Sequence, residues 1–281
     1  MNQKTELNNI DSLIYGFKNQ ELNVIASRVG HGKTSLAISS VIQSIKDNKS
    51  VLYFSLDLTK EQITTRINDD IDTSKLIIDD TKYPTFEYIK NQITELLSNK
   101  SRNIKLVVID YLQLIENDTN INISRELKKL AILFNVSIVL LSQLSVNIEH
   151  RINKFPYLKD LEDKNIEIDA NLILLLWISE FHQEEDEKIK ESESHRKGEN
   201  YKSPYIEKAK KEAIIFIAKQ INGKANIHRR VIFNTDTLAF EDKPNIDIDD
   251  TNWNEELDEI FDKVSNMEKD TIGFINGNNN E

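Results

Sequence analysis

Apolar and polar positions along the chain follow two alternating patterns between residues 22 and 234. Short continuous apolar runs are typical of buried strands, and the longer stretches between them have apolar residues at helical spacing. The predicted strands are Leu22–Ala26, Val51–Leu56, Ile104–Ile109, Ser137–Leu141, Leu172–Trp177, Ala213–Ala218 and Arg230–Asn234. The predicted helices are Lys33–Lys46, Lys60–Asn68, Thr85–Ser98 and Ser124–Phe134, the last with Ser124 as its N-cap. The alternation predicts an α/β fold with a mainly parallel sheet flanked by helices.

Two segments depart from this alternation. Residues 182–212 are dense in Glu and Lys and contain few apolar anchors, which predicts a solvated, mobile, charged insertion. Residues 244–281 carry eleven acidic side chains against two lysines and end in an Asn-rich run. We therefore expect one domain over residues 1–243 and an acidic, partly disordered tail over 244–281. A short helix around Trp253 and Phe261 either docks on its own domain or binds a partner.

Composition narrows the class of protein. With 281 residues and 39% hydrophobic content, the chain is long enough to bury a full core. It contains no cysteine, which excludes disulfides and thiolate metal sites. No uncharged apolar run approaches the roughly 20 residues of a membrane helix, so we expect a soluble, cytoplasmic protein without a membrane partner. The formal net charge is −11 and lies mostly in the tail, so the remaining near-neutral body is compatible with a local basic strip.

The loop after the first predicted strand carries the strongest chemical signal. An apolar run ending at Ala26 gives way to Gly32-Lys33-Thr34 at the start of a predicted helix. Backbone N–H groups of such a loop surround phosphates, the lysine reaches the β- and γ-oxygens, and the hydroxyl binds Mg²⁺. The first glycine of the usual motif is replaced by a serine, and an ordinary glycine-rich turn is the alternative for this segment alone. The predicted ATP-binding residues are Ser27, Arg28, Gly30, His31, Gly32, Lys33, Thr34 and Ser35.

Polar side chains also follow three other predicted strands. Asp110 ends the strand that begins at residue 104, where a carboxylate holds Mg²⁺ together with Thr34. Asp57 follows the strand that begins at residue 51 and is a candidate for orienting the attacking water. Gln143 follows the strand that begins at residue 137. Because the carboxyl ends of parallel strands meet at one edge, we expect these side chains in a single site.

Four motifs link these strand ends to a known family. They are residues 54–58 (Phe-Ser-Leu-Asp-Leu), 110–114 (Asp-Tyr-Leu-Gln-Leu), 141–144 (Leu-Ser-Gln-Leu) and 218–223 (Ala-Lys-Gln-Ile-Asn-Gly). Together they resemble the C-terminal RecA-like motor domain of the DnaB-type replicative DNA helicases of bacteria and phages, from about Glu6 to Asp242. The resemblance implies a RecA-like P-loop NTPase that uses ATP and Mg²⁺, moves on single-stranded DNA and self-associates into a ring.

The resemblance also implies a role for each matching residue. It makes Lys33 and Thr34 ligands of nucleotide and Mg²⁺, with Asp110 as the acidic metal ligand. It makes Asp57 the catalytic carboxylate and Gln143 the γ-phosphate sensor. Lys219 is implied to reach the nucleotide of a neighbouring subunit.

Two positions depart from the family's catalytic pattern. The arginine that the family supplies in trans stands two residues after the lysine, where this chain has Ile221. An apolar side chain cannot neutralise charge on the transferring phosphoryl group. Arg229 or Arg230 is the candidate replacement, with surface charges on a hairpin as the alternative. Asp57 is one methylene shorter than the family's glutamate, so both departures predict slow hydrolysis.

The DNA-binding side departs in a similar way. Where the family's loop reads Asp-Leu-Arg-Glu, this chain has Asp-Leu-Glu-Asp over residues 160–163, which places a like charge beside phosphate. The remaining DNA-binding candidates are Arg151, Lys154, Lys159 and Lys164, and a solvated basic face is the alternative.

Two functions follow from these patterns. The first is a helicase motor or DNA-dependent ATPase without the family's N-terminal domain. The alternative is a degenerate ATP-binding module that regulates or loads a replicative helicase without unwinding DNA, with replication proteins bound through the acidic tail. The retained lysine, threonine and carboxylate of the nucleotide site favour the first function, whereas Ile221 and Glu162 favour the alternative.

Overall fold

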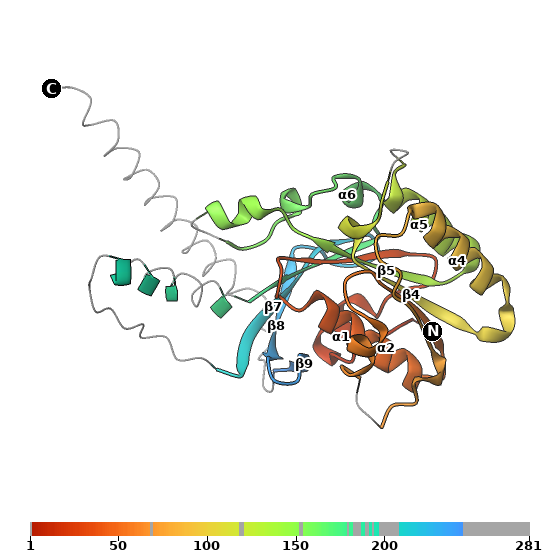
Figure 1. Ribbon diagram of the computed structural model, residues 1–281, viewed down its shortest axis with the longest axis horizontal. Helices are drawn as coiled ribbons and strands as arrows, with labels where there is room; N and C mark the ends of the chain where they lie inside the picture. Colours follow the sequence, from red (N-terminus) through yellow and green to blue (C-terminus); the bar gives the residue numbers. More distant parts are fainter. Residues whose placement is uncertain are drawn as a thin grey trace.

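The computed structural model describes residues 2–67, 70–117, 121–151, 154–178, 180–181, 187–188, 191–192, 194–196 and 208–243. The predicted acidic tail and most of the predicted charged insertion lie outside these residues. Within them, nine strands form one sheet in the order β3-β2-β4-β5-β1-β6-β7-β8-β9 (Figure 1). None of the helices in this described part is both long enough and apolar enough to cross a membrane.

The strands fall into a parallel group and an antiparallel group. The parallel strands are β1 (Leu22–Ser27), β2 (Ser50–Ser55), β3 (Leu76–Asp79), β4 (Ile104–Asp110), β5 (Ser137–Gln143) and β6 (Leu172–Trp177). The antiparallel extension consists of β7 (Lys210–Gln220), β8 (Ile227–Asn234) and β9 (Ala239–Asp242). The central parallel strands are buried on both faces, which explains why their sequences are continuous apolar runs rather than alternating ones.

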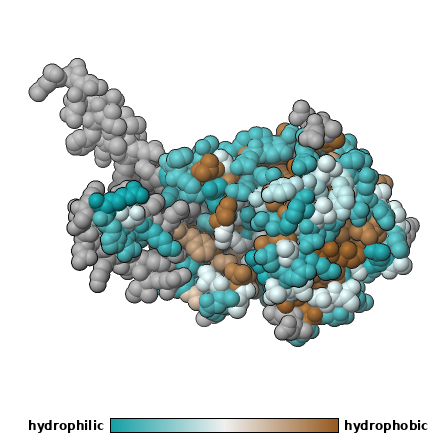
Figure 2. Space-filling view, viewed as in Figure 1, coloured by the Kyte–Doolittle hydropathy of each residue, from teal (hydrophilic) through white to brown (hydrophobic). Residues whose placement is uncertain are grey.

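Helices cover both faces of the sheet, as Figure 1 shows. On one face lie α1 (Asn8–Ile14), α2 (Lys33–Lys46) and α3 (Lys60–Thr64), and on the other lie α4 (Phe86–Ser98), α5 (Ile123–Phe134) and α6 (Asn165–Asp169). Short 3-10 turns occur at Thr73–Lys75, Lys100–Arg102, Leu112–Leu114, Val146–His150 and Leu158–Asp160. The two faces enclose separate hydrophobic cores, and the outer surface in Figure 2 is mainly hydrophilic with scattered apolar residues.

Residues from opposite ends of the described chain meet at α1. The residue preceding this helix, Leu7, supplies no side-chain cap. Instead the Asp242 carboxylate, at the end of β9, accepts the backbone N–H groups of Asn8 at 2.9 Å and Asn9 at 3.2 Å. A carboxylate at this position satisfies N–H groups that have no partner within the helix. The last strand therefore holds the first helix in place.

The seven predicted strands and four predicted helices are confirmed, with shifted ends. The sequence pattern missed α1, α6, β3 and β9, because these elements are short and β3 is half-exposed at the sheet edge. Residues 210–212, predicted as the end of the insertion, begin β7. The predicted helix Lys60–Asn68 is wrong at its end, since α3 stops at Thr64; Asn68 itself lies outside the described residues.

The start of α5 corrects another prediction. The cap is Asn122, whose Oδ1 accepts the N–H of Arg125 at 3.0 Å, and not Ser124. The Ser124 hydroxyl donates instead to Oδ2 of Asp169 at 2.9 Å, and the Asn122 amide donates to the same oxygen at 2.9 Å. Arg125 Nε donates to the other oxygen at 3.3 Å. Burial raises the pKa of Asp169, but these donors outweigh burial and hold the pKa below its usual range.

The hydrogen bonds to Asp169 predict a pH-dependent contribution to stability. Because its pKa is lower in the folded state than the unfolded value of 3.8, the ionised carboxylate stabilises the fold above that pH, and the stabilisation is lost as the pH falls through the folded pKa. We expect Asp169→Asn to lower the free energy of unfolding by about 1–3 kcal/mol at neutral pH. The difference from wild type shrinks towards about pH 3 in urea unfolding experiments. Asp236→Asn, in an exposed turn, is the control and should change the free energy of unfolding by less than about 0.5 kcal/mol. A difference between Asp169→Asn and wild type that stays constant with pH contradicts the prediction.

Candidate nucleotide-binding site

The loop between β1 and α2 has a backbone that only glycine adopts easily. Gly30 and Gly32 have φ of 82° and 85°, in the left-handed region. Gly32 precedes α2, and a Cβ there would lie 2.7 Å from Cζ of Phe240 in β9. Lys33 and Thr34 form the first turn of α2, where unpaired N–H groups and the helix dipole favour a phosphate. The structure therefore provides the local geometry of an anion-binding loop.

A buried carboxylate joins this helix to two strands. The Thr34 hydroxyl and the Tyr53 hydroxyl both donate to Oδ2 of Asp110, each at 2.8 Å. Burial raises the pKa of Asp110, while these two donors and the charge of Lys33 act in the opposite direction. Burial and the neighbouring carboxylate raise the pKa of Tyr53 well above its usual range, so its hydroxyl stays a donor. The sequence pattern treated Tyr53 only as part of an apolar strand.

The oxygen atoms of this cluster suit a magnesium ion. A threonine hydroxyl and a carboxylate oxygen 2.8 Å apart are hard ligands of the kind that Mg²⁺ shares with substrate phosphates and water. The described residues contain no group of three or more His, Cys, Asp or Glu side chains that could hold a metal by themselves. Thr34 and Asp110 thus suit a metal that arrives together with a nucleotide.

Lys33 and Asp57 lie at the same edge of the sheet. The Lys33 ammonium is 5.2 Å from the ring centroid of Tyr111. Burial lowers the pKa of Lys33, and the carboxylates of Asp110 and Asp57 oppose that effect, so Asp57 lies within electrostatic range of the lysine. Asp57 is exposed, and its carbonyl oxygen accepts a hydrogen bond from Lys82 Nζ at 2.6 Å.

Gln143 ends β5 beside Ser27 in the sheet register. Gln113, in the 3-10 turn after β4, accepts the N–H of Gln143 at 2.9 Å and donates to its carbonyl oxygen at 3.2 Å. Gln113 thereby fixes the backbone of Gln143 relative to β4. The sequence analysis named Gln113 only as part of the motif at residues 110–114 and did not predict this contact.

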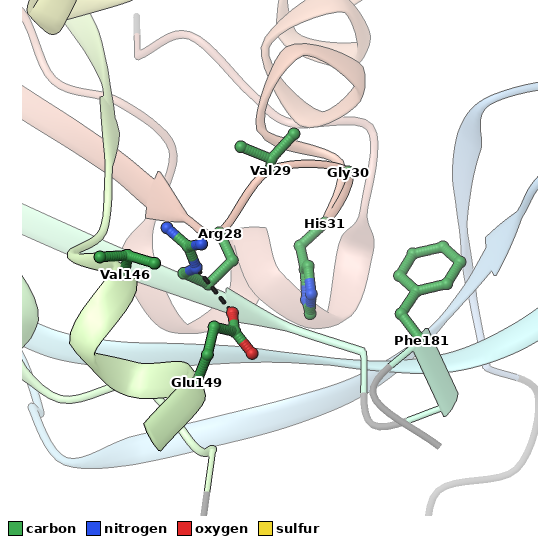
Figure 3. Close-up of a pocket in the computed structure, with 7 residues that line it drawn as sticks. All are labelled: Arg28, Val29, Gly30, His31, Val146, Glu149 and Phe181. Atoms are coloured by element: carbon green, nitrogen blue, oxygen red, sulfur yellow. Dashed lines mark hydrogen bonds and ion pairs between the residues drawn. The ribbon is translucent and has the colours of Figure 1, made fainter. Parts of the chain in front are cut away.

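The Arg28 side chain holds the loop against the segment after β5. Its Nε donates to Glu149 at 2.8 Å, and its Nη1 donates to the carbonyl oxygen of Leu144 at 2.7 Å. Figure 3 shows Arg28 and Glu149 turned towards each other in a pocket of about 390 Å³, which Val29 and Val146 also line. Arg28 was predicted to bind nucleotide, and its guanidinium is used here within the protein.

His31 and Ser27 also use their side chains within the protein. His31 is buried, and its Nδ1 accepts the N–H of Ile178, just after β6, at 3.1 Å. Its ring packs edge to face with that of Phe181, with centroids 5.5 Å apart. Figure 3 shows the two side chains next to each other in the pocket. The Ser27 hydroxyl donates to the carbonyl oxygen of Arg28 at 2.8 Å, and Ser35 is buried in α2. The side chains of His31 and Ser27 are thus engaged within the protein, and the His31 N–H also donates to the carbonyl oxygen of Arg28, at 3.3 Å.

Lys219 lies near the amino ends of the parallel strands, whereas the loop lies at their carboxyl ends. It pairs with Ile173 near the start of β6, whereas the loop follows the end of β1. Its Nζ donates to the carbonyl oxygens of Glu167 at 2.6 Å and Ile168 at 3.2 Å. The structure therefore does not bring Lys219 into the nucleotide site of its own chain.

Arg229 and Arg230 lie on β8, level with the carboxyl end of β6 and therefore with the loop end of the sheet. Arg230 pairs with Ile214, which pairs with Trp177 at the end of β6. Ile221, by contrast, donates its N–H to the carbonyl oxygen of Asn171, before the start of β6. The two arginines are thus displaced along the sheet from position 221.

The four DNA-binding candidates lie on one segment, residues 151–164. Arg151 Nη2 donates to Oδ2 of Asp160 and to the carbonyl oxygen of Phe155, both at 2.9 Å. Lys159 lies over the ring of Tyr157, 5.5 Å from its centroid. Lys164 donates to the carbonyl oxygen of Lys159, and Lys154 is half-buried nearby. The Arg151 guanidinium therefore contributes to the folding of this segment.

Comparisons with known proteins identify relatives of the chain. A family model described as DnaB-like helicase C terminal domain matches residues 3–71 and 67–242. A probable replicative DNA helicase of Trieres chinensis is 33% identical over 217 residues, which cover 63% of this chain and 48% of that protein. The replicative DNA helicase DnaB of Mycoplasma pneumoniae is 35% identical over 230 residues, which cover 66% of this chain and 47% of that protein. The chain thus spans about half the length of these two relatives.

A solved structure also resembles the chain. It is an isolated ATPase domain that matches with a TM-score of 0.69 and 24% identity, over 86% of this chain and 92% of that domain. This likeness and the mostly parallel nine-stranded sheet confirm the expected α/β RecA-like fold.

The hydrogen bond from Tyr53 to Asp110 predicts a stability effect. Tyr53→Phe keeps the ring but removes one donor from a buried carboxylate, so we expect the free energy of unfolding to fall by about 1–2 kcal/mol. Urea unfolding measures this change. Tyr15→Phe removes the hydroxyl of an exposed ring and should change stability by less than about 0.5 kcal/mol. Equal effects of the two substitutions contradict the prediction.

Proposed function

The chain belongs to the DnaB-like helicase C terminal domain family, and we propose that it is the motor of a replicative DNA helicase, coupling ATP hydrolysis to movement on single-stranded DNA. The observation that carries this proposal is the contact of Thr34, in the first turn of α2, with the buried carboxylate of Asp110. The extent of the family match, from residue 3 to residue 242, favours a motor over a regulatory module that only binds ATP.

In the proposed reaction the triphosphate binds at the N-terminus of α2. Lys33 contacts the β- and γ-oxygens, and Thr34 and Asp110 hold Mg²⁺. The bound ion neutralises charge on these phosphate oxygens. Asp57 orients a water molecule and accepts a proton from it as the water oxygen forms a bond to the γ-phosphorus, while the bond to the bridging oxygen breaks and its electron pair leaves with ADP. Gln143, at the end of the neighbouring strand, senses the γ-phosphate.

Three parts of the chain suggest binding partners. Single-stranded DNA contacts the segment 151–164, where Lys154, Lys159 and Lys164 supply positive charge. We expect other copies of the chain to form a ring, in which Lys219 reaches the nucleotide of a neighbour; its distance from the loop of its own chain supports this arrangement. We expect the acidic tail, residues 244–281, to bind replication proteins. We also expect the protein to act in the cytoplasm, where its DNA substrate would be.

Measuring ATP turnover with and without single-stranded DNA tests the motor. We expect DNA to raise the turnover rate of the wild type by about fivefold or more, and Lys33→Ala to lower it by at least about 100-fold. Lys46→Ala is the matched control, since it makes the same change at the exposed far end of the same helix. Nucleotide binding without any effect of DNA, or equal turnover in the wild type and Lys33→Ala, rejects the proposal.

We further propose that hydrolysis is slow because position 221 is apolar. Arginines supplied in trans in phosphoryl transfer contribute about 10³–10⁵ in rate, and the sheet register displaces Arg229 and Arg230 from this position. We expect Ile221→Arg to raise kcat by about tenfold or more at concentrations that allow self-association. Ile132→Arg adds the same charge at another exposed isoleucine and should leave kcat unchanged. An unchanged rate in Ile221→Arg contradicts this prediction.

A further inference from the structure

The connection between β3 and α4 brings a lysine to the catalytic edge. Lys82 Nζ donates to the carbonyl oxygen of Asp57 at 2.6 Å, although the two residues are 25 positions apart. Lys82 and Asp57 are both exposed, so this ammonium faces solvent at the edge where the parallel strands end. The sequence pattern assigned no role to Lys82.

Tyr111 relates this connection to the phosphate loop. Burial raises the pKa of Tyr111, and the carboxylates of Asp57 and Asp110 raise it further. Tyr83 also lies within electrostatic range of the Tyr111 hydroxyl. The Tyr111 ring is also the surface against which the Lys33 ammonium lies, at 5.2 Å. Lys33 and the connection that carries Lys82 therefore approach the same aromatic ring.

The connection is held in an unusual backbone conformation. Tyr83 has a φ of 48°, which costs a residue with a Cβ about 1–2 kcal/mol. Hydrogen bonds on its C-terminal side hold it there: Glu116 N–H donates to the carbonyl oxygen of Pro84 at 3.0 Å, and Phe86 N–H donates to that of Glu116 at 3.2 Å. Since Glu116 follows β4, these bonds fix the position of Lys82 relative to the strand that carries Asp110.

The other cations predicted for the site are differently engaged. The Arg28 guanidinium donates to Glu149 and to Leu144, and Lys219 lies at the opposite edge of the sheet. Lys82 donates to a neutral carbonyl, that of Asp57, at the edge of the sheet where the loop lies. A hydrogen bond between an ammonium and a phosphate oxygen is roughly twice as strong as a neutral one, and the flexible lysine stem allows the exchange.

We propose that Lys82 is a further catalytic residue, which donates to a γ-phosphate oxygen of ATP and neutralises negative charge on the transferring phosphoryl group from within the same chain. This inference rests on the proposed ATP hydrolysis. Lys82 forms and breaks no covalent bond and transfers no proton; its ammonium stays charged throughout. Part of the positive charge that phosphoryl transfer requires then comes from the chain that binds the nucleotide.

Steady-state kinetics and nucleotide binding test this role. We expect Lys82→Ala to lower kcat about 10- to 100-fold while the KM for ATP changes by less than about threefold, because the contact strengthens in the transition state. Affinity for ADP should be unchanged, while affinity for ADP with aluminium fluoride, which mimics the transferring phosphoryl group, falls by a similar factor. Lys82→Arg should recover most of both losses. Lys90→Ala, in α4 and paired with Glu87, is the control expected to behave as wild type.

The outcomes separate this inference from the proposed function. If Lys82→Ala has wild-type kcat while Lys33→Ala is inactive, the role of Lys82 is rejected and ATP hydrolysis at the site stands. Equal losses of ADP and ADP–aluminium fluoride binding in Lys82→Ala also reject it, since they indicate general damage to the site. If the wild type does not hydrolyse ATP under any of these conditions, both proposals fail.

Discussion

The hydrogen bonds accepted by the buried Asp110 carboxylate determine the geometry of the site. An ionised carboxylate in the interior is costly unless donors surround it, and here the donors come from α2 and β2. The carboxylate therefore fixes the first turn of α2 over the end of β4, and the phosphate loop cannot move independently of these elements. Because β1, β2, β4 and β5 are parallel, their ends bring Asp57 and Gln143 to the same edge.

The parts of the fold that follow local patterns could be predicted from the sequence. Continuous apolar runs identified the central strands because those strands are buried on both faces, and Lys33, Thr34 and Asp110 follow from their places at a helix start and a strand end. The weakly patterned β3 escaped because it is a half-exposed edge strand. A local pattern thus predicts buried strands and helix starts, but not a half-exposed edge strand.

Other features depend on partners distant in sequence. Both Asn122 and Ser124 are good N-cap residues, and Asp169 decides between them by taking the hydroxyl of Ser124. Arg28 looked like a phosphate ligand, but its partner Glu149 lies 121 positions away. His31 likewise has its partner Ile178 147 positions away. No spacing rule within the loop predicts such contacts, and the tertiary structure alone supplies them.

The sheet places Lys219 and Lys82 at different distances from the nucleotide loop of their own chain. A strand rises about 3.3 Å per residue, so Lys219, level with Ile173, lies on the order of 13 Å along the sheet from the level of Trp177. Lys219 therefore lies away from the nucleotide loop of its own chain, whereas Lys82 lies at the edge that carries Asp57. The Arg28–Glu149 ion pair adds a further link, because Glu149 lies in the turn that leads directly into Arg151 and the segment 151–164. The phosphate loop and that segment are therefore joined by a direct contact within one chain, and no second copy is needed for it.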